Sequence, residues 1–135
     1  MKAAEYFDSW SNCAESVLLA SVGEQQNVPR VATAFGGGMG RQGEVCGALT
    51  GALMAIGVKH GRDGPDTERR DHTYMLARSL FSDFSSRFGS VICRELTGCN
   101  LATEEGMKKF SAERIHYTKC HDFVTFCEEW VKERT

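Results

Sequence analysis

Residues 46–59 read CGALTGALMAIGVK, and this stretch decides the fold. Gly47 and Gly51 lie four residues apart, and so do Ala48 and Ala52, so a helix here would carry two rows of small side chains. Such rows allow a neighbouring helix to approach unusually closely. We therefore predict that this stretch is the central buried helix of the protein; it is too short to span a bilayer.

A glycine-rich run precedes this helix. Residues 36–43 read GGGMGRQG, and that much glycine opposes regular secondary structure. We predict a loop here, with the central helix beginning around Gly43 or Glu44 and ending near Lys59. Residues 38–43 match GxGxxG by letter, but without a preceding strand and a βαβ unit they do not indicate dinucleotide binding.

Helical periodicity accounts for most of the remaining chain. Asn12 and Glu15 have the spacing of a capping box, which favours a break near Asn12 with Cys13 as the first residue of the next helix; an unbroken helix would place Cys13 in its middle. No segment has a convincing strand pattern. The predicted fold is all-α, a single domain over residues 1–135 built as a bundle of about five to six helices.

Composition limits the classes of function. The 135 residues are 41% hydrophobic and 25% charged, with a net charge of −2, which is typical of a soluble globular protein. No cluster of Lys and Arg is dense enough for nucleic acid or an anionic membrane, so we predict neither partner. The first residues, 1–6, lack the apolar core of a signal peptide, so we expect a cytoplasmic protein.

The cysteines then need a chemical explanation, because disulfides are rare in a reducing compartment. Four of the six follow a predicted helix start by one to three residues: Cys13, Cys46, Cys93 and Cys120. A helix N-terminus carries free N–H donors and partial positive charge, so a thiol there should ionise more readily than usual. If the four helix starts converge, they form a thiol-rich pocket surrounded by backbone N–H groups.

The other candidate ligands rank lower. Cys99 and Cys127 are more typical of accessory or structural positions, on a loop and an apolar helix face. The four histidines lie in polar surroundings typical of surface residues, and only His121, beside Cys120, is a candidate. The cysteines lack CxxC spacing, which removes the usual support for a zinc ribbon or a thioredoxin-type site but is compatible with an iron–sulfur cluster.

The segments Gly36–Gly40 and Cys46–Gly51 resemble the redox-active family named for its C_GCAxxG_C_C pattern. That pattern has one cysteine near the N-terminus, a CGAxxG motif and two later cysteines. It maps here onto Cys13, Cys46 with its motif, Cys93 and Cys120, and residues 90–96 also resemble the family's third-cysteine region. The resemblance covers most of the chain and leaves Cys99 and Cys127 outside the pattern.

The resemblance implies redox activity inferred from the cysteines, without an established substrate. A similar segment is fused to haem domains in split-Soret cytochromes, where an iron–sulfur centre is associated with it, so a cluster is credible here. The chain has no CxxCH, so covalent haem is not expected.

We therefore predict one redox centre formed by Cys13, Cys46, Cys93 and Cys120, in one of two versions. In the thiol version, Cys46 attacks an oxidised partner as a thiolate, and Cys93 or Cys120 resolves the mixed disulfide without a cofactor. In the cluster version, all four ligate an iron–sulfur cluster and the protein transfers single electrons. A structural or zinc-binding module is a third alternative, with less support from spacing.

Either redox version would act on a partner protein or a small molecule. An oxidoreductase activity and a homodimer are both compatible with the sequence, which does not specify them.

Overall fold

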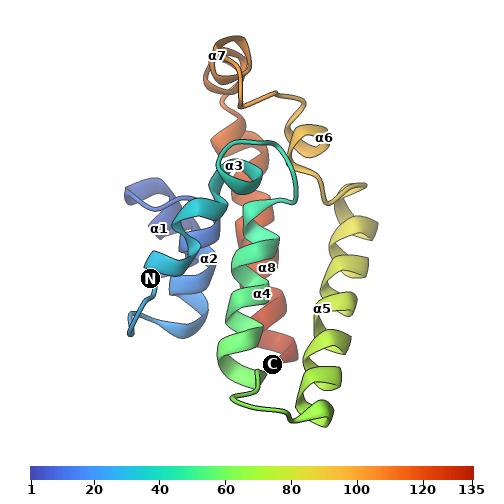
Figure 1. Ribbon diagram of the computed structural model, residues 1–135. Helices are drawn as coiled ribbons and strands as arrows, with labels where there is room; N and C mark the ends of the chain where they lie inside the picture. Colours follow the sequence, from blue (N-terminus) through green and yellow to red (C-terminus); the bar gives the residue numbers. More distant parts are fainter.

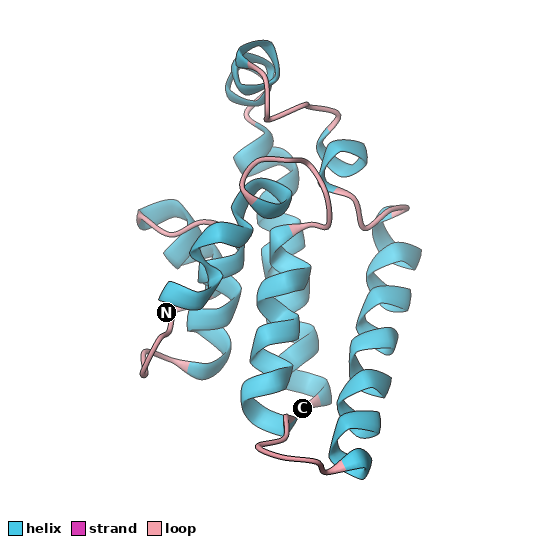
Figure 2. Ribbon diagram, in the orientation of Figure 1, coloured by secondary structure: helices cyan, strands magenta, loops and turns pink.

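The computed structural model describes all 135 residues, and the chain is helical throughout, with no strand (Figure 2). The elements in chain order are α1 (Ala3–Ser9), α2 (Cys13–Val22), the 3-10 helix η1 (Arg30–Phe35), α3 (Gly36–Met39), α4 (Gly47–His60), α5 (Thr67–Phe88), α6 (Cys93–Thr97), α7 (Glu104–Ala112), the π-helix η2 (His116–Cys120) and α8 (His121–Arg134). The all-α prediction is confirmed. The predicted number of helices, five to six, was too low.

α4 is the central helix, with α1 and α2 on one side, α5 on the other and α8 behind it (Figure 1). Gly51 faces α2 so closely that a Cβ atom there would overlap the carbonyl oxygen of Ala14. Gly47 makes the same kind of approach one turn earlier, against Cys13. The row of small residues thus brings two backbones together, as the sequence predicted.

Asn12 separates α1 from α2. Its side chain accepts a hydrogen bond from the backbone N–H of Glu15, and the Glu15 carboxylate accepts one from the backbone N–H of Asn12. This reciprocal pair is the predicted capping box, and it makes Cys13 the first residue of α2.

The glycine-rich segment was predicted to be a loop, but it winds into a short left-handed turn. Gly37, Gly38, Met39, Gly40 and Arg41 all have φ between 60° and 68°. L-residues disfavour this conformation by about 1–2 kcal/mol each, whereas glycine adopts it freely, which explains why three of the five are glycine. Backbone bonds from the N–H of Gly43 to Gly37 and from that of Glu44 to Gly38 close the turn.

α4 begins at Gly47, later than the predicted Gly43 or Glu44. The residues between pair instead with the segment before α6. Val45 and Ile92 form an isolated antiparallel bridge, and the N–H of Cys93 donates to the carbonyl of Glu44 at 2.6 Å. This pairing ties the start of α4 to the start of α6.

α5 and α8 meet through aromatic side chains. The rings of Phe84, Phe88, Phe123 and Phe126 pack with centroids 4.7–5.8 Å apart. Such tilted and edge-to-face pairs stabilise the contact beyond the burial of their area. No helix of the protein combines the length and the apolarity that crossing a bilayer requires.

Candidate functional site

A cavity of about 460 Å³ lies where α2, α4 and α6 begin, and its lining includes all four predicted cysteines, Cys13, Cys46, Cys93 and Cys120. α3 and α6 lie near this end of α4 in Figure 1. The four side chains come from segments far apart in the sequence. Cys99 and Cys127 are buried but are not part of the lining.

Cys13 occupies the most enclosed position of the four. Its Sγ lies against Gly47, where a Cβ atom would overlap it. Backbone N–H groups of Gly37, Ala14 and Gly47 act as hydrogen-bond donors toward this sulfur. The left-handed turn supplies the first of these donors and the start of α4 the last, so both glycine-containing segments serve to surround Cys13.

Cys46 is the N-cap residue of α4, directly before the helix, rather than inside its first turn as a start at Gly43 or Glu44 would have placed it. The backbone N–H groups of Ala48 and Leu49 are donors toward its sulfur, as an N-cap position provides. The N–H of Cys46 itself donates to the carbonyl of Val91 at 2.8 Å. This bond and the Cys93–Glu44 bond hold Cys46 and Cys93 at a fixed separation.

Cys93 is the first residue of α6, which begins later than the sequence predicted, since Cys93 was expected to follow the helix start by one to three residues. The hydroxyl of Thr97, one turn later, bonds the Cys93 carbonyl at 2.7 Å and also approaches its thiol. On the other side, a Cβ atom on Gly38 would lie 2.7 Å from Cβ of Cys93. The left-handed turn therefore packs directly on this cysteine.

Cys120 does not occupy a helix start, and this prediction was wrong. It ends the π-helix η2 with helical backbone angles, φ −63° and ψ −32°, and the chain continues directly into α8. The helical segment that carries it begins at His116, four residues before Cys120 rather than the expected one to three. Free N–H donors are absent from such an internal position, so Cys120 reaches the cavity from the side of a helix.

The ionisation of the four thiols also differs from the prediction, which expected thiols that lose their protons more readily than usual. Burial raises the pKa of Cys13 and Cys46 and raises that of Cys93 to about 11, and at Cys46 and Cys93 the neighbouring thiols raise the pKa further. The pKa of Cys120 is raised for the same reasons. Backbone and side-chain donors oppose these shifts without reversing them. Desolvation outweighs the helix termini, so all four groups are neutral thiols near pH 7 when nothing is bound.

The spacing of the sulfur atoms distinguishes a site for one zinc ion from a site for a larger metal centre. Tetrahedral zinc with Zn–S bonds of about 2.3 Å requires its thiolates to lie about 3.8 Å apart. The only three potential ligand atoms that all lie within 4.8 Å of one another belong to Asp8, His116 and His121, so no three cysteine sulfurs do. The cysteine sulfurs therefore do not lie at the mutual distances that one tetrahedral zinc ion sets.

The rest of the lining is mainly apolar, with one fixed cation and one imidazole. Phe7, Leu101 and Phe110 are among its apolar residues, Arg41 is its only Lys or Arg, and His116 is its only histidine. From the sequence, His116 was expected at the surface, and nothing in the sequence marked Asp8 as a candidate. Only the fold brings these two residues together, at 3.0 Å.

Comparison with protein families gives one result. The family model described as "Putative redox-active protein (C_GCAxxG_C_C)" matches residues 11–134, nearly the whole chain. The chain belongs to this family. The C_GCAxxG_C_C family is thus described as redox-active, in agreement with a chain whose six cysteines are all free. Comparisons with curated proteins and with solved structures gave no match.

Proposed function

We propose that the protein is a one-electron carrier in which the thiolates of Cys13, Cys46, Cys93 and Cys120 hold an iron–sulfur cluster. The observation that carries this proposal is the convergence of these four side chains, from four separate segments, on one cavity of about 460 Å³. Four cysteine thiolates are the usual ligand set of such clusters, and they need not be close in sequence.

The residues fit a cluster better than a single ion. In a four-iron cluster each thiolate binds a different iron, so the sulfurs can lie farther apart than around one zinc ion. No three of the cysteine sulfurs lie within 4.8 Å of one another, whereas a single zinc ion would hold its thiolates closer than that. Backbone glycines provide the room: Gly38 faces Cys93 and Gly47 faces Cys13, each at a distance that a Cβ atom would obstruct.

The ionisation of the thiols supports the cluster version over the dithiol version. A nucleophilic cysteine needs a thiolate fraction near neutral pH, and these thiols have raised pKa values. Bound cations reverse that preference, because a coordinating thiol is deprotonated outright. The site is therefore unsuited to free thiolates and suited to thiolates whose charge a metal balances.

A bound cluster would supply the one-electron couple, and the protein's own groups would tune it. Donors to the thiolate sulfurs, among them the N–H groups of Gly37 and Ala48, favour the more negative reduced state. The apolar side chains of Phe7 and Phe110 limit the access of water. Arg41 places a positive charge at the same cavity, where it favours an anionic centre. The partner that exchanges electrons would be a redox protein or a small molecule.

Anaerobic purification followed by iron and acid-labile sulfide analysis tests the proposal. We expect iron and sulfide in near-equal amounts, a brown colour and an electron paramagnetic resonance signal in one of the accessible oxidation states. Cys46→Ser should lose iron and sulfide together. Cys99→Ser is the matched control, because Cys99 is buried nearby but does not line the cavity, and it should retain both.

Two results would overturn the proposal. Colourless protein that binds no iron and sulfide even after reconstitution, and whose thiol titre falls reversibly by two, would select the dithiol version. Stoichiometric zinc without sulfide would select the structural alternative.

A further inference from the structure

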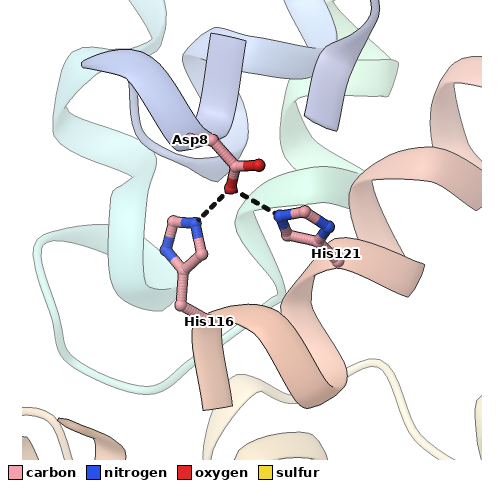
Figure 3. Close-up of side chains that lie close together, drawn as sticks. All are labelled: Asp8, His116 and His121. Atoms are coloured by element: carbon pink, nitrogen blue, oxygen red, sulfur yellow. Dashed lines mark hydrogen bonds and ion pairs between the residues drawn. The ribbon is translucent and has the colours of Figure 1, made fainter. Parts of the chain in front are cut away.

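A second group of potential ligands adjoins the thiol cavity, whose lining includes one of them, His116. Asp8 of α1 meets His116 and His121, which begin η2 and α8 (Figure 3). One carboxylate oxygen, Oδ1 of Asp8, lies 3.0 Å from Nε2 of His116 and 2.5 Å from Nε2 of His121. All three ligand atoms lie within 4.8 Å of one another.

From this geometry we propose that Asp8, His116 and His121 form a binding site for a divalent transition-metal ion, separate from the thiol centre. Two imidazoles and one carboxylate, with open positions for water or a further ligand, are a ligand set typical of Zn²⁺ and Fe²⁺. The proposal does not depend on the cluster, because none of its ligands is a thiol.

The distances suit metal coordination. With metal–ligand bonds of about 2.0–2.1 Å, two ligand atoms at tetrahedral to right angles lie about 2.9–3.4 Å apart. The contact of Asp8 with His116 falls within that interval, and the contact with His121 is a few tenths of an ångström shorter. A bound ion therefore requires a small outward movement of side chains that are only partly buried, with 27% of each histidine exposed.

The π-helix is what brings the two histidines together. Residues five apart on an α-helix point about 140° away from each other. The wider π turn of His116–Cys120 adds one residue to the turn, so His116 and His121 project toward the same side, as Figure 3 shows. π turns of this kind occur often at functional sites.

Neighbouring side chains hold the ligands in place before any ion binds. The ring of Phe7 stacks on His116 with centroids 3.7 Å apart and planes 5° from parallel. Phe7 directly precedes Asp8, so α1 provides both the support for one ligand and another ligand itself.

The charges around the site favour the binding of a cation, because no lysine or arginine side chain pairs with Asp8. The Arg114 guanidinium lies over Tyr117, 5.0 Å from that ring's centroid, in a cation–π contact. No salt bridge joins Asp8 to a lysine or an arginine. The Asp8 carboxylate therefore has only the two imidazoles as partners. A bound metal ion would take the place of the protons on the ring nitrogens that face Asp8.

Co²⁺ is the probe that distinguishes this site from the thiols. Thiolate ligands give intense sulfur-to-cobalt charge-transfer absorption, whereas imidazole and carboxylate ligands give only the weaker visible bands. We expect one equivalent of Co²⁺ to bind without charge transfer, in the wild-type protein and in Cys46→Ser. His121→Gln and Asp8→Asn should each lower the affinity for this Co²⁺ ion at least about tenfold. A loss of that size is typical even for residues that only support a metal ligand.

His72→Gln is the matched control, because His72 is an exposed histidine of α5 that is remote from Asp8, and Co²⁺ affinity should not change. Nuclear magnetic resonance of the imidazole ¹⁵N atoms on adding Zn²⁺ tests the same site without any variant, through shifts at His116 and His121. Co²⁺ or Zn²⁺ affinity that survives His121→Gln, or that Cys46→Ser abolishes, would overturn the proposal, as would unchanged ¹⁵N resonances.

Discussion

The sulfur of Cys13 rests on the backbone of Gly47, with no room for a Cβ atom between them. Gly47→Ala should therefore displace the Cys13 sulfur and deprive the cluster of one ligand, although alanine is the better helix former by about 1 kcal/mol. We expect this variant to lose most of its iron and sulfide. Metal and sulfide analysis after anaerobic reconstitution checks it.

Two glycines of the same helix provide the controls. Gly57 has nothing within 4 Å of its added Cβ position, so Gly57→Ala should keep the cluster and increase the free energy of unfolding by about 0.5–1 kcal/mol. Gly51→Ala would strike the backbone of Ala14 and should destabilise the fold, by about 1–3 kcal/mol. Full iron content in Gly47→Ala would contradict the assignment of Cys13 as a ligand.

The left-handed turn gives a second prediction, for Gly38. Its φ of 68° strains any other residue, and an added Cβ would lie 2.7 Å from both Cβ of Cys93 and the backbone nitrogen of Glu44. Gly38→Ala should lower the free energy of unfolding by more than about 2 kcal/mol, from the strain and the overlap together. Urea denaturation of the cluster-free protein measures this change.

Gly40 is the control for Gly38, because a substitution there introduces backbone strain without steric overlap. Its φ is 60°, but the nearest atom to an added Cβ is 3.9 Å away. Gly40→Ala should therefore show the conformational cost alone, about 1–2 kcal/mol. If Gly38→Ala and Gly40→Ala lose equal amounts of unfolding free energy, the overlap of the added Cβ with Cys93 does not contribute to the loss in Gly38→Ala.

Local sequence rules predicted much of this fold, because the decisive interactions are local. The capping box of Asn12 and Glu15 joins residues three apart, and Asp66 caps α5 in the same way, by accepting a hydrogen bond from the N–H of Arg69. The small-residue rows of α4 are periodic, so their close packing could also be read from the sequence. Each of these features depends on few residues and on known backbone geometry.

The features that escaped prediction all depend on contacts between distant segments. Glu44 belongs outside α4 because its carbonyl accepts a hydrogen bond from Cys93, and no local rule anticipates that pairing. The π turn before Cys120 likewise gave no recognisable pattern, so the meeting of His116 with Asp8 was missed. Thiol ionisation was misjudged because it depends on burial, which a position in the sequence does not determine.

The indole of Trp130 anchors α8 to α5 through a third testable contact. Its Nε1–H donates to Oδ2 of Asp83 at 2.8 Å, and the indole is 5% exposed. Asp83→Ala leaves this buried donor without a partner, which should cost about 1–2 kcal/mol of unfolding free energy. Asp71→Ala on the same helix removes only an exposed ion pair with Arg70 and should change stability by less than about 0.5 kcal/mol. Similar melting temperatures for the two variants would refute the role given to the Trp130 bond.

The raised pKa of Cys93, about 11, predicts how the cluster-free protein responds to alkali. Only the thiolate reacts with iodoacetamide, so alkylation of Cys93 should accelerate about tenfold for each pH unit up to about pH 11. In the urea-unfolded chain the rate should level off near the ordinary value of 9.0. Peptide-level mass spectrometry resolves Cys93 from the other cysteines.

The same shift links pH to stability. Between pH 9.0 and about 11 the unfolded chain releases the Cys93 proton while the folded protein keeps it. The stabilisation from the neutral buried thiol is therefore complete below pH 9 and is lost as the pH rises toward 11, so urea denaturation should show lower stability at about pH 10 than at about pH 8. The reconstituted protein should lack this loss, because bound iron keeps the thiolate deprotonated throughout. Alkylation of Cys93 that levels off near neutral pH would instead reveal an activated thiolate and favour thiol–disulfide exchange.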